Sequence, residues 1–490
     1  MLNESNLLIG GNLTDQIKLN PKMGNRHGLI AGATGTGKTV TLQVLAEGFS
    51  KLGVPVFMAD IKGDLSGLAN AASAHPKIEE RIKKIKITDY QSQASPVVFW
   101  DVYGKLGHPL RTTVSDMGPL LLSNLLELND TQTGVLYACF KIADDNGLLL
   151  LDFNDLRSML TWVSNNTKEL KGEYGNITSV SIGAIQRDLL ILQQQGVENF
   201  LGEPALRLED LMRIDWSGRG FINVMDVTQL MQKSPRLYAT ILLWLLSELF
   251  ENLPEVGDAD KPKFVMFFDE AHLLFDDAPE ALTDKIEQIV RLIRSKGVGV
   301  YFISQSPMDI PENVLGQLGL RIQHALRAFT PKDQKAIKLV AQTFRQNPNI
   351  DITTCLSELG IGEALVSTLD ENGSPTQVER TLIRPPESQI GPIKMKERAE
   401  KLDRSPVSGK YDTPVDRESA HELLKIRAEE AEKRALDIEE EKARKKTTRK
   451  KPQRSTNSPM DAMIKSAARA IGTKIGGKLI GGYNQLVEYF

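Results

Sequence analysis

The fold of this chain is decided by one stretch near its N-terminus, Gly32-Ala33-Thr34-Gly35-Thr36-Gly37-Lys38-Thr39. The stretch has the pattern G-x-x-x-x-G-K-[ST], and it lies between an apolar run at 27–31 and a helical pattern at 40–46. Glycines let the backbone curl so that several N–H groups face one anion, and the following helix directs its positive dipole end to the same point. All eight residues are therefore expected to cradle the phosphates of ATP. Lys38 would reach the β- and γ-phosphates, and the Thr39 hydroxyl would hold Mg²⁺.

The composition is that of an ordinary globular protein, with 41% hydrophobic and 25% charged residues among 490. The net charge of −3 predicts no general attraction to nucleic acid or acidic lipid, so any basic site must be local. The two cysteines, Cys139 and Cys355, match no metal or redox spacing and suit a reducing compartment. No apolar run has the length of a membrane span, and the first residues lack a positively charged signal-peptide region. We expect a cytoplasmic protein.

Four segments follow one another along the chain: a short N-terminal segment at 1–24, an α/β domain at 25–386, a linker at 387–416 and a charged tail at 417–490. In the α/β domain, apolar β-rich runs alternate with helical patterns, which predicts a mainly parallel sheet flanked by helices. The residues from about 105 to 215 have helical periodicity and form a predicted helical insertion. The predicted strands are 27–32, 54–60, 84–88, 97–102, 220–227, 264–269, 298–304, 320–326 and 364–369.

The charged tail has three parts. Its first part, 417–441, is dense in Glu, Lys, Arg and Ala and predicts a long solvated helix. The basic block 442–454 is either a solvated linker or a tether for DNA phosphates. The last part, 460–490, has apolar residues at helical spacing with lysine and arginine between them, and predicts an amphipathic helix. Such a helix either packs on the α/β domain, joins copies in an oligomer or lies on anionic lipid.

A second chemical motif follows the apolar run 263–268, which ends in Asp269 and Glu270. Buried parallel strands tolerate charge where they emerge at their carboxyl ends, and open α/β sheets bind ligands there. Asp269 would hold Mg²⁺ through water, and Glu270 would orient and polarise the water that attacks the γ-phosphate. No Asn-Lys-x-Asp motif is present, which argues against a GTPase. The string 269–272 also spells the DEAH motif of superfamily 2 helicases, but the chain has no room for the second motor domain that those helicases need.

Three further polar positions are candidates for the same chemistry. Gln305 follows the predicted strand 298–304 and would sense the γ-phosphate, although it also fits a polar strand end before a proline turn. Arg291 and Arg294 are three residues apart and share one helix face. A guanidinium that reaches a neighbouring subunit would make hydrolysis depend on assembly, but a basic surface helix is an equal alternative. The stretch 60–64 ends another strand and would contact nucleotide, Mg²⁺ or DNA, or form a plain turn.

Together these motifs resemble the HerA/FtsK group of additional-strand P-loop ATPases, and most closely the bacterial stand-alone HerA-like (YjgR-like) helicase-like family. The matching stretches are 25–39, 60–67, 249–255 and 362–367. The resemblance implies a RecA-like motor domain that forms hexameric rings and moves double-stranded DNA through a central pore. It assigns Lys38 and Thr39 to nucleotide and Mg²⁺, Asp269 and Glu270 to hydrolysis, and Gln305 to sensing. It also favours Arg294 as the arginine finger supplied in trans. If Arg294 does not act across a subunit boundary, the alternatives are Arg291, Arg321 or Arg327, or no finger at all.

Two functions from different classes are thus open. The first is an ATP-hydrolysing DNA translocase or helicase that assembles as a ring of identical subunits. The second is an ATP-dependent remodeller or switch that acts on an unidentified protein partner, with membrane contact through the segment 460–490. A nucleotide-stabilised scaffold without catalysis is disfavoured because the acidic pair is intact.

Overall fold

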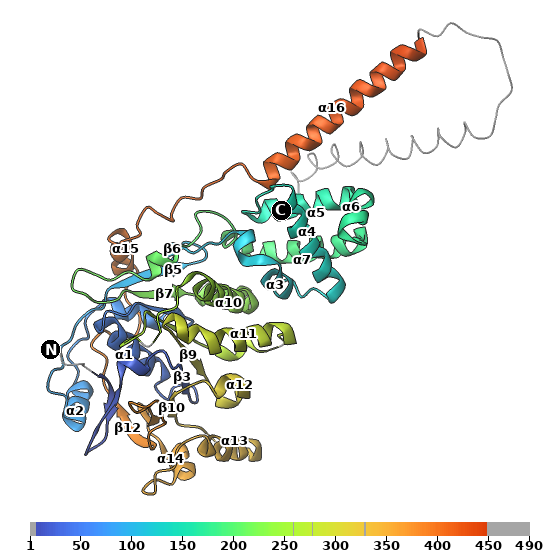
Figure 1. Ribbon diagram of the computed structural model, residues 1–490. Helices are drawn as coiled ribbons and strands as arrows, with labels where there is room; N and C mark the ends of the chain where they lie inside the picture. Colours follow the sequence, from blue (N-terminus) through green and yellow to red (C-terminus); the bar gives the residue numbers. More distant parts are fainter. Residues whose placement is uncertain (1–5, 258, 277, 328–329, 448–490) are drawn as a thin grey trace, which may run out of the picture. The chain divides into compact units, whose positions relative to one another are not determined.

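A computed structural model of the protein describes residues 6–257, 259–276, 278–327 and 330–447 (Figure 1). Within these ranges the chain forms one mixed sheet of twelve strands. The strands are β1 (Leu7–Gly11), β2 (Gln16–Leu19), β3 (Gly28–Ala31), β4 (Val56–Asp60), β5 (Val97–Asp101), β6 (His108–Pro109), β7 (Ile222–Asp226), β8 (Phe264–Phe268), β9 (Val298–Ser304), β10 (Leu320–His324), β11 (Glu363–Ser367) and β12 (Glu379–Ile383). Their order in the sheet is β2-β1-β12-β11-β10-β3-β9-β8-β4-β7-β5-β6.

The same described ranges contain sixteen α-helices. They are α1 (Lys38–Lys51), α2 (Pro76–Ile85), α3 (Val114–Leu125), α4 (Asp130–Asp145), α5 (Phe153–Asn165), α6 (Thr167–Tyr174), α7 (Ser179–Gln195), α8 (Leu208–Leu211), α9 (Thr228–Lys233), α10 (Pro235–Asn252), α11 (Glu280–Leu292), α12 (Glu312–Leu315), α13 (Pro331–Gln342), α14 (Ile352–Glu358), α15 (Met395–Asp403) and α16 (Ala420–Thr447). The chain divides into two compact units at residue 425, and the whole sheet belongs to the first unit. Among the described helices, none is long and apolar enough to cross a bilayer.

The strands from β10 to β6 pair in parallel, and β2, β1, β12 and β11 continue the sheet in antiparallel fashion. The fold is thus the expected α/β class, a large and mainly parallel sheet flanked by helices. The strand that ends at the phosphate loop, β3, lies between β10 and β9. One additional strand, β9, separates β3 from β8, which carries the acidic pair at its end.

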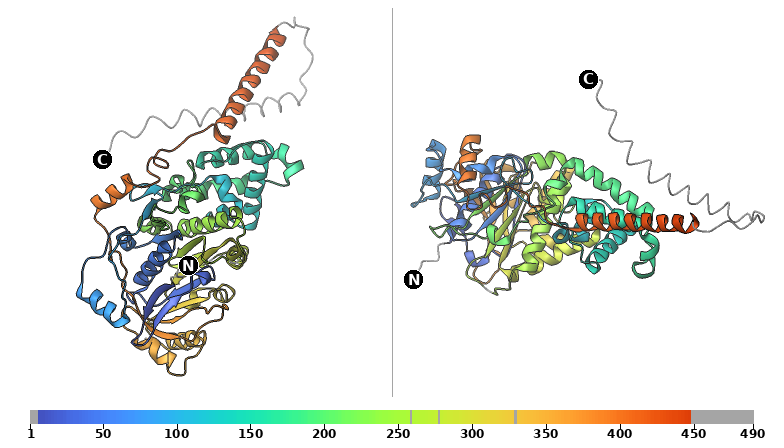
Figure 2. Two further views of the ribbon diagram at one scale, coloured as in Figure 1. Left: turned by 60° about the vertical axis from the view of Figure 1, so that its left-hand side comes forward. Right: turned by 90° about the horizontal axis from the view of Figure 1, so that it is seen from above.

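Helices cover both faces of the sheet (Figure 2). The strand residues alternate between two apolar cores. Ile30 of β3 packs in the core that includes α1, whereas Leu29 and Ala31 pack in the core that includes α10 and α11. This alternation follows from the two-residue period of a strand and shows that β3 is buried on both sides. The flanking helices thus keep water away from both faces of the strand that leads to the phosphate loop.

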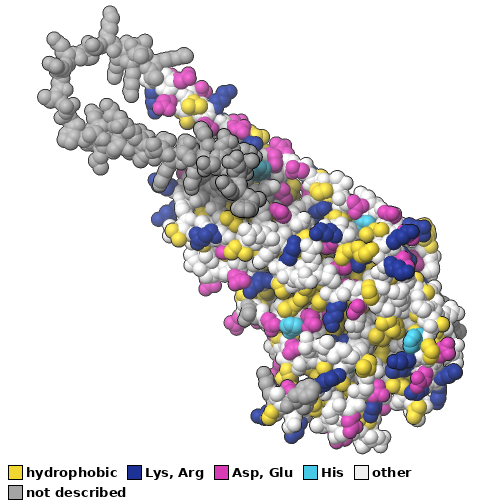
Figure 3. Space-filling view, turned by 180° about the vertical axis from the view of Figure 1, so that it is seen from behind, with side chains coloured by type: hydrophobic (Ala, Val, Ile, Leu, Met, Phe, Trp, Pro, Cys, Tyr) yellow, Lys and Arg dark blue, Asp and Glu magenta, His cyan; other side chains and the backbone are white. Residues whose placement is uncertain are grey.

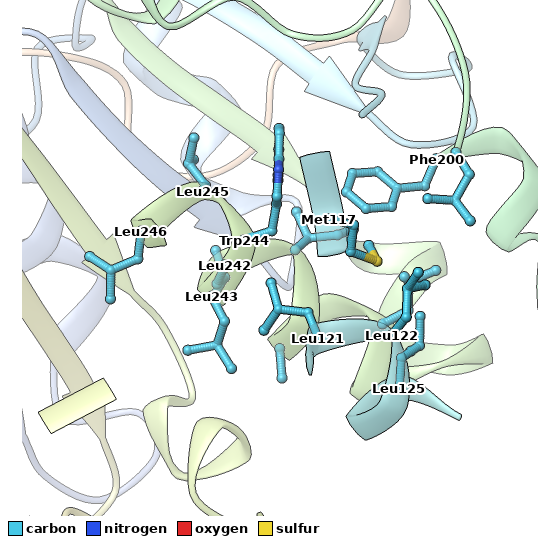
Figure 4. Packing of buried hydrophobic residues seen from close by; sticks show 14 of the residues in the cluster. Met117, Leu121, Leu122, Leu125, Phe200, Leu242, Leu243, Trp244, Leu245 and Leu246 are labelled. Atoms are coloured by element: carbon cyan, nitrogen blue, oxygen red, sulfur yellow. The ribbon is translucent and has the colours of Figure 1, made fainter. Parts of the chain in front are cut away.

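The helix α10 joins the sheet to the predicted helical insertion, which contains α3 to α8. Its residues 237–246 are all buried. Leu242 and Leu245 are fully buried, and Trp244 meets Phe200 edge to face at 5.6 Å (Figure 4). Leucines and methionine of α3 complete this contact, so the insertion shares one continuous core with the sheet.

Three sequence predictions differ from the structure. The strand predicted at 84–88 is wrong: α2 ends at Ile85 and Lys86 turns left-handed, because alternating lysine and isoleucine also suits the end of an amphipathic helix. Part of the N-terminal segment 1–24 joins the sheet as β1 and β2. The Pro- and Ser-containing segment 387–416, expected to be a linker, belongs to the first unit and contains α15 and the buried side chains of Arg398 and Tyr411.

The long charged helix predicted for 417–441 corresponds to α16, whose residues 425–442 are exposed. Most of the basic block 442–454 and the whole segment 460–490 lie outside the described residues. On the face shown in Figure 3, Lys and Arg side chains are interspersed with Asp and Glu, in keeping with the small net charge.

The segment that follows β12 is bound to α1 by a buried carboxylate. Glu47 accepts hydrogen bonds from the backbone N–H of Glu387 and of Ser388, both at 2.9 Å, and from the Ser388 hydroxyl. Lys51, one turn further along α1, forms an ion pair with Glu387. Two neighbouring turns of α1 therefore hold the chain at residues 387–388.

Replacing Glu47 with alanine is expected to lower the free energy of unfolding by about 2–4 kcal/mol, because each buried N–H left without an acceptor costs roughly 1–3 kcal/mol. Urea unfolding followed by circular dichroism measures the loss. Glu47→Gln keeps an acceptor and should lose less. The exposed Glu429→Ala is the matched control, with an expected change within about 0.5 kcal/mol. Equal stability of Glu47→Ala and the control would contradict this role.

Candidate nucleotide-binding site

The phosphate loop connects the end of β3 to the first residue of α1, as the sequence predicts. Three of its glycines have positive φ: 151° at Gly32, 78° at Gly35 and 114° at Gly37. Other residues adopt such angles only with strain. At Gly32 there is also no space, since a Cβ atom would lie 2.5 Å from the Cβ of His324. The glycines are therefore required by this loop conformation, in which backbone N–H groups are available to an anion.

Lys38 lies at the start of α1 and folds back over the loop. Its Nζ donates to the carbonyl of Gly32 at 2.5 Å and to that of Ala33 at 3.3 Å. The pKa of Lys38 is lowered, chiefly by desolvation, and the carboxylates of Glu270 and Asp269 oppose this shift. The ammonium group and the two carboxylates are thus close enough to interact. The structure brings the loop and the acidic pair together at one edge of the sheet.

The acidic pair follows β8 in an unusual backbone conformation. Glu270 is left-handed, with φ of 48° and ψ of 50°, and its N–H donates to Oδ1 of Asp269 at 3.0 Å. The hydroxyl of Tyr238, on α10, donates to the carbonyl of Asp269 at 2.7 Å. These two hydrogen bonds fix the turn, so the two carboxylates are held by the backbone and by the buried helix α10.

The two carboxylates differ in their surroundings. Desolvation and the charge of Glu270 raise the pKa of Asp269 to about 6, while Lys38 and Lys62 act against the shift. One oxygen of Glu270, Oε2, is buried without a hydrogen bond and lies 3.4 Å from Nδ1 of His272. A buried acceptor with an unused lone pair is suited to hold a water molecule.

The residues present fit a magnesium ion. Thr39 supplies a hydroxyl at the first turn of α1, and Asp269 supplies a carboxylate at the end of β8. Mg²⁺ usually keeps several waters and is held by one or two protein oxygens together with substrate phosphates. A hydroxyl and a carboxylate beside a phosphate loop are therefore a sufficient protein contribution.

Gln305 lies beside the phosphate loop. The strand β9 pairs in parallel with β3, and Ser304 is the partner of Ala31, so the next residue of each strand is at the same edge. The turn after β9 is fixed by Asp309, which accepts hydrogen bonds from the hydroxyl of Ser304 and from the N–H of Ser306. Gln305 itself is exposed and lines an open pocket of about 650 Å³ together with residues of the 272–276 turn.

The structure does not bring Arg294 to the phosphate loop. Arg291 and Arg294 are exposed and precede β9 in the chain, whereas the phosphate loop follows β3. Because β3 and β9 are neighbouring parallel strands, the arginines and the loop lie at opposite edges of the sheet. The seven residues of β9 therefore separate them from the loop edge by roughly 20 Å. Both arginines line a pocket of about 500 Å³ at this opposite edge, which Arg26, Arg321 and Arg345 also line.

The remaining finger candidates occupy different places. Arg321 donates to the carbonyls of Thr343 at 2.8 Å and Leu315 at 3.3 Å, so its guanidinium is used to join β10 to neighbouring loops. Arg327 is exposed and follows β10, at the same edge as the phosphate loop.

The stretch 60–64 forms a tight turn at the end of β4. Asp60 is buried and accepts a hydrogen bond from the N–H of Leu65 at 3.0 Å. Burial and the nearby Asp226 raise the pKa of Asp60 to about 6. Asp60, Asp226 and Asp101 lie side by side at the ends of β4, β7 and β5. This row of carboxylates was not predicted, because its members are far apart in the sequence.

A buried histidine supports the phosphate loop from the side of β10. His324 has Nε2 2.9 Å from the hydroxyl of Thr41 on α1, and Nδ1 2.9 Å from the carbonyl of Glu363. Burial lowers the pKa of His324 to about 4, and the charge of Lys38 adds to this effect. The ring is therefore neutral at neutral pH. The sequence analysis missed it, although a histidine inside the apolar run 320–326 is a usable signal.

The comparisons with known proteins agree with this arrangement. The family model described as helicase HerA-like C-terminal matches residues 5–483. This chain belongs to that family. Among curated relatives, the DNA double-strand break repair helicase HerA of Sulfolobus acidocaldarius is 24% identical over an alignment of 380 residues, which covers 73% of this chain and 65% of that protein. The protein of the same description from Saccharolobus solfataricus is 25% identical over an alignment of 372 residues, which covers 73% of this chain and 64% of that protein. The HerA-like chain thus spans about 65% of the length of these relatives.

Solved structures of low identity share the fold. The plasmid coupling protein TrwB in complex with a non-hydrolysable GTP analogue superposes with a TM-score of 0.52 and 13% identity, covering 79% of the HerA-like chain and 93% of TrwB. The unbound bacterial conjugative coupling protein TrwBdeltaN70 gives a TM-score of 0.50 and 14% identity, covering 78% and 91%. The RecA-like P-loop fold expected from the sequence is therefore confirmed.

Replacing His324 with leucine is expected to weaken ATP binding about tenfold, which corresponds to about 1.4 kcal/mol. The reason is that Thr41 and the carbonyl of Glu363 lose their partner beside the loop. Isothermal titration calorimetry measures the affinity. The control is His421→Leu, which removes a histidine that bonds Ser158 in the helical insertion. If both variants lose thermal stability but keep wild-type affinity for ATP, His324 does not position the loop.

Proposed function

We propose that this HerA-like protein is an ATPase whose subunits assemble into a hexameric ring and translocate double-stranded DNA. The observation that carries the proposal is the meeting of Lys38 with Asp269 and Glu270 at one sheet edge. The motor domain would comprise residues 25–386 with the helical insertion at about 105–215, extended by β1 and β2. The relatives that are named DNA repair helicases support DNA as the substrate.

In this mechanism the phosphate loop, 32–39, binds the triphosphate through its backbone N–H groups. Lys38 leaves the carbonyls of Gly32 and Ala33 and reaches the β- and γ-phosphates. Thr39 and Asp269 would hold Mg²⁺, and the ion would supply positive charge next to the phosphates.

Glu270 then orients the attacking water. Its buried Oε2 has no hydrogen bond, so it is available to accept one from that water. Gln305, at the end of the neighbouring strand β9, would form a hydrogen bond to the γ-phosphate and lose it after hydrolysis. The proposed sensor and the proposed base thus follow adjacent strands, β9 and β8.

A ring accounts for the position of Arg294. Its distance of roughly 20 Å from the loop edge of its own subunit prevents it from acting in cis. In a head-to-tail ring, one edge of each subunit faces a different edge of the next subunit. The exposed arginine would then stabilise the charge on the neighbour's γ-phosphate.

Duplex DNA is expected to raise the rate of ATP hydrolysis several-fold at about 50 mM salt, and the stimulation should fall steeply by about 200 mM salt, because phosphate neutralisation releases counterions. Phosphate release measures the rate. Glu270→Gln is the control: it should bind ATP and show almost no hydrolysis with or without DNA. A rate that is indifferent to duplex DNA, single-stranded DNA and RNA would argue against a nucleic-acid motor.

Arg294→Ala is expected to bind ATP normally and to lose most hydrolysis. When it is mixed with Lys38→Ala, activity should return, since roughly a quarter of the contacts in a randomly mixed ring join an intact loop to an intact arginine. Arg291→Ala, which removes an exposed arginine that lines the same pocket, is the matched control and should keep its rate. Full activity of Arg294→Ala alone would contradict its role as an arginine finger. If activity returned only when Arg291→Ala, and not Arg294→Ala, was mixed with Lys38→Ala, Arg291 would be the finger.

A further inference from the structure

Trp216 is completely exposed to solvent, whereas the other three tryptophans of the chain are covered. Trp100 and Trp244 are buried, and Trp162 is half-buried. Trp216 belongs to the segment between α8 and β7, in which Ile214 is also 55% exposed. Aromatic rings contribute large contact areas to binding sites, so an indole presented in this way is a candidate contact for a ligand.

The segment 214–220 is a short hairpin whose turn is fixed by hydrogen bonds. The N–H of Asp215 donates to the carbonyl of Arg219 at 2.8 Å. Oδ1 of Asp215 accepts hydrogen bonds from the N–H of Ser217 at 2.9 Å, from the hydroxyl of Ser217 at 2.7 Å and from the N–H of Arg219 at 2.9 Å. The turn that carries Trp216 is therefore pre-organised, and a ligand does not have to order it.

Further hydrogen bonds fasten the hairpin to the sheet domain. The N–H of Gly220 donates to the carbonyl of Ser50 at 2.8 Å, and the Ser50 hydroxyl donates to the carbonyl of Gly220 at 2.6 Å. The guanidinium of Arg219 donates to the carbonyl of Ala94 at 2.9 Å. The hairpin is thus held by the last turn of α1 and by the chain that leads to β5.

The hairpin lies at the edge of the sheet that is opposite to the nucleotide-binding site. It precedes β7, and β7, β4 and β8 are parallel neighbours, whereas Asp269 and Glu270 follow the end of β8. These strands have five residues each, so roughly 17 Å separates the two edges. The arginine-containing pocket at the same edge is lined by other segments. A ligand on Trp216 is therefore separate from the site of ATP hydrolysis.

A lysine lies beside the hairpin. A Cβ atom at Gly53 would lie 2.7 Å from the carbonyl oxygen of Gly218 and 3.2 Å from Nζ of Lys261, so the ammonium group adjoins the hairpin backbone. Lys261 is exposed, and its Nζ donates to the carbonyl of Leu52 at 2.6 Å. Because this partner is neutral, the positive charge of Lys261 is retained.

These surroundings favour a nucleic-acid base over a protein surface. The exposed apolar groups of the hairpin are Trp216 and Ile214, and polar or small residues follow at 217–218. A stable protein interface covers roughly 800 Å² on each partner around an apolar core, which is far more than one indole and one isoleucine provide. One ring beside one ammonium group matches one base and its adjoining phosphate.

We propose that Trp216 is a stacking platform for an unpaired base of single-stranded nucleic acid, and that Lys261 contacts the phosphate next to that base. Every base has a flat face, so the platform accepts any sequence. The inference rests on nucleic acid as the substrate in the proposed function. In a motor that moves on duplex DNA, this site would hold a strand that has separated from its complement.

The test measures the affinity of the full chain for a labelled oligothymidylate of about 16 nucleotides, the upper end of common site sizes, and for a labelled blunt duplex. Fluorescence anisotropy reports both affinities. Trp216→Ala should bind the oligothymidylate about tenfold more weakly and the duplex as the wild type does, because paired bases are not available for stacking. Trp216→Phe keeps an aromatic ring and should retain most of the affinity. Tyr137→Ala, which removes a 44% exposed aromatic side chain of α4, is the matched control and should change neither affinity.

Salt dependence separates stacking from charge. Lys261→Ala should reduce the slope of the logarithm of the oligothymidylate association constant against the logarithm of salt concentration by about 0.7, as expected for one phosphate of a single strand. Trp216→Ala should leave this slope unchanged, because stacking releases no counterions. An unchanged slope in Lys261→Ala would contradict the phosphate contact.

Intrinsic fluorescence gives a direct readout of the ring. Oligothymidylate should quench the tryptophan emission of the wild type, and most of this quenching should disappear in Trp216→Phe. Wild-type affinity of Trp216→Ala for the oligothymidylate, or equal quenching in Trp216→Phe, would overturn the platform. The proposed function would survive that result if duplex DNA still stimulated hydrolysis. Protein that binds neither nucleic acid, with hydrolysis indifferent to both, would overturn the platform and the DNA motor together.

Discussion

The site depends on the parallel pairing of β3, β9 and β8. Parallel strands end at one edge, so the residues that follow them meet there whatever their separation in sequence. This pairing places the ammonium of Lys38 in the field of Asp269 and Glu270, and it places Gln305 between them at the end of the middle strand. The buried cores on both faces of the sheet keep the three strand ends aligned, so the geometry of the site is a property of the whole sheet.

The same edge explains why the site contains so many strained or buried polar groups. Glu270 is left-handed, three loop glycines have positive φ, and His324 is neutral and fully buried. The left-handed backbone of Glu270 and the burial of the His324 ring each cost stability on their own, whereas the glycines adopt positive φ without strain. Neighbouring groups stabilise them by hydrogen bonds. The Tyr238 hydroxyl donates to the carbonyl of Asp269, and the Thr41 hydroxyl and the Glu363 carbonyl contact the ring nitrogens of His324. The strain is concentrated where phosphate and water are expected to bind.

The sequence predicts the parts of the fold that are continuous along the chain. The phosphate loop and the acidic pair each follow a run of apolar residues, and a buried parallel strand requires such a run. The edge strand β2 and the internal strand β12 were missed, because their partly exposed residues give them mixed polarity. The strand predicted at 84–88 failed because two isoleucines among lysines suit a helix end equally well.

Relationships between distant segments could not be predicted. The register of β4, β7 and β5 places Asp60, Asp226 and Asp101 side by side, although more than 100 residues separate the nearest of them from Asp226. The hydrogen bonds from residues 387–388 to Glu47 could not be predicted either, because nothing near Glu47 in the sequence indicates its partner. The proline- and serine-containing composition after β12 predicted a linker, although several side chains of this segment are buried, including Arg398 and Tyr411.

The attachment at Glu47 has a mechanical consequence. The helix α1 begins at Lys38 and Thr39, and its middle and last turns hold residues 387–388. A helix of this length is stiff, so a displacement at one end is transmitted to the other as a rigid movement. Force applied to the chain beyond β12 would therefore act on the helix that begins with Lys38 and Thr39, the lysine and the hydroxyl proposed to bind the phosphates and Mg²⁺.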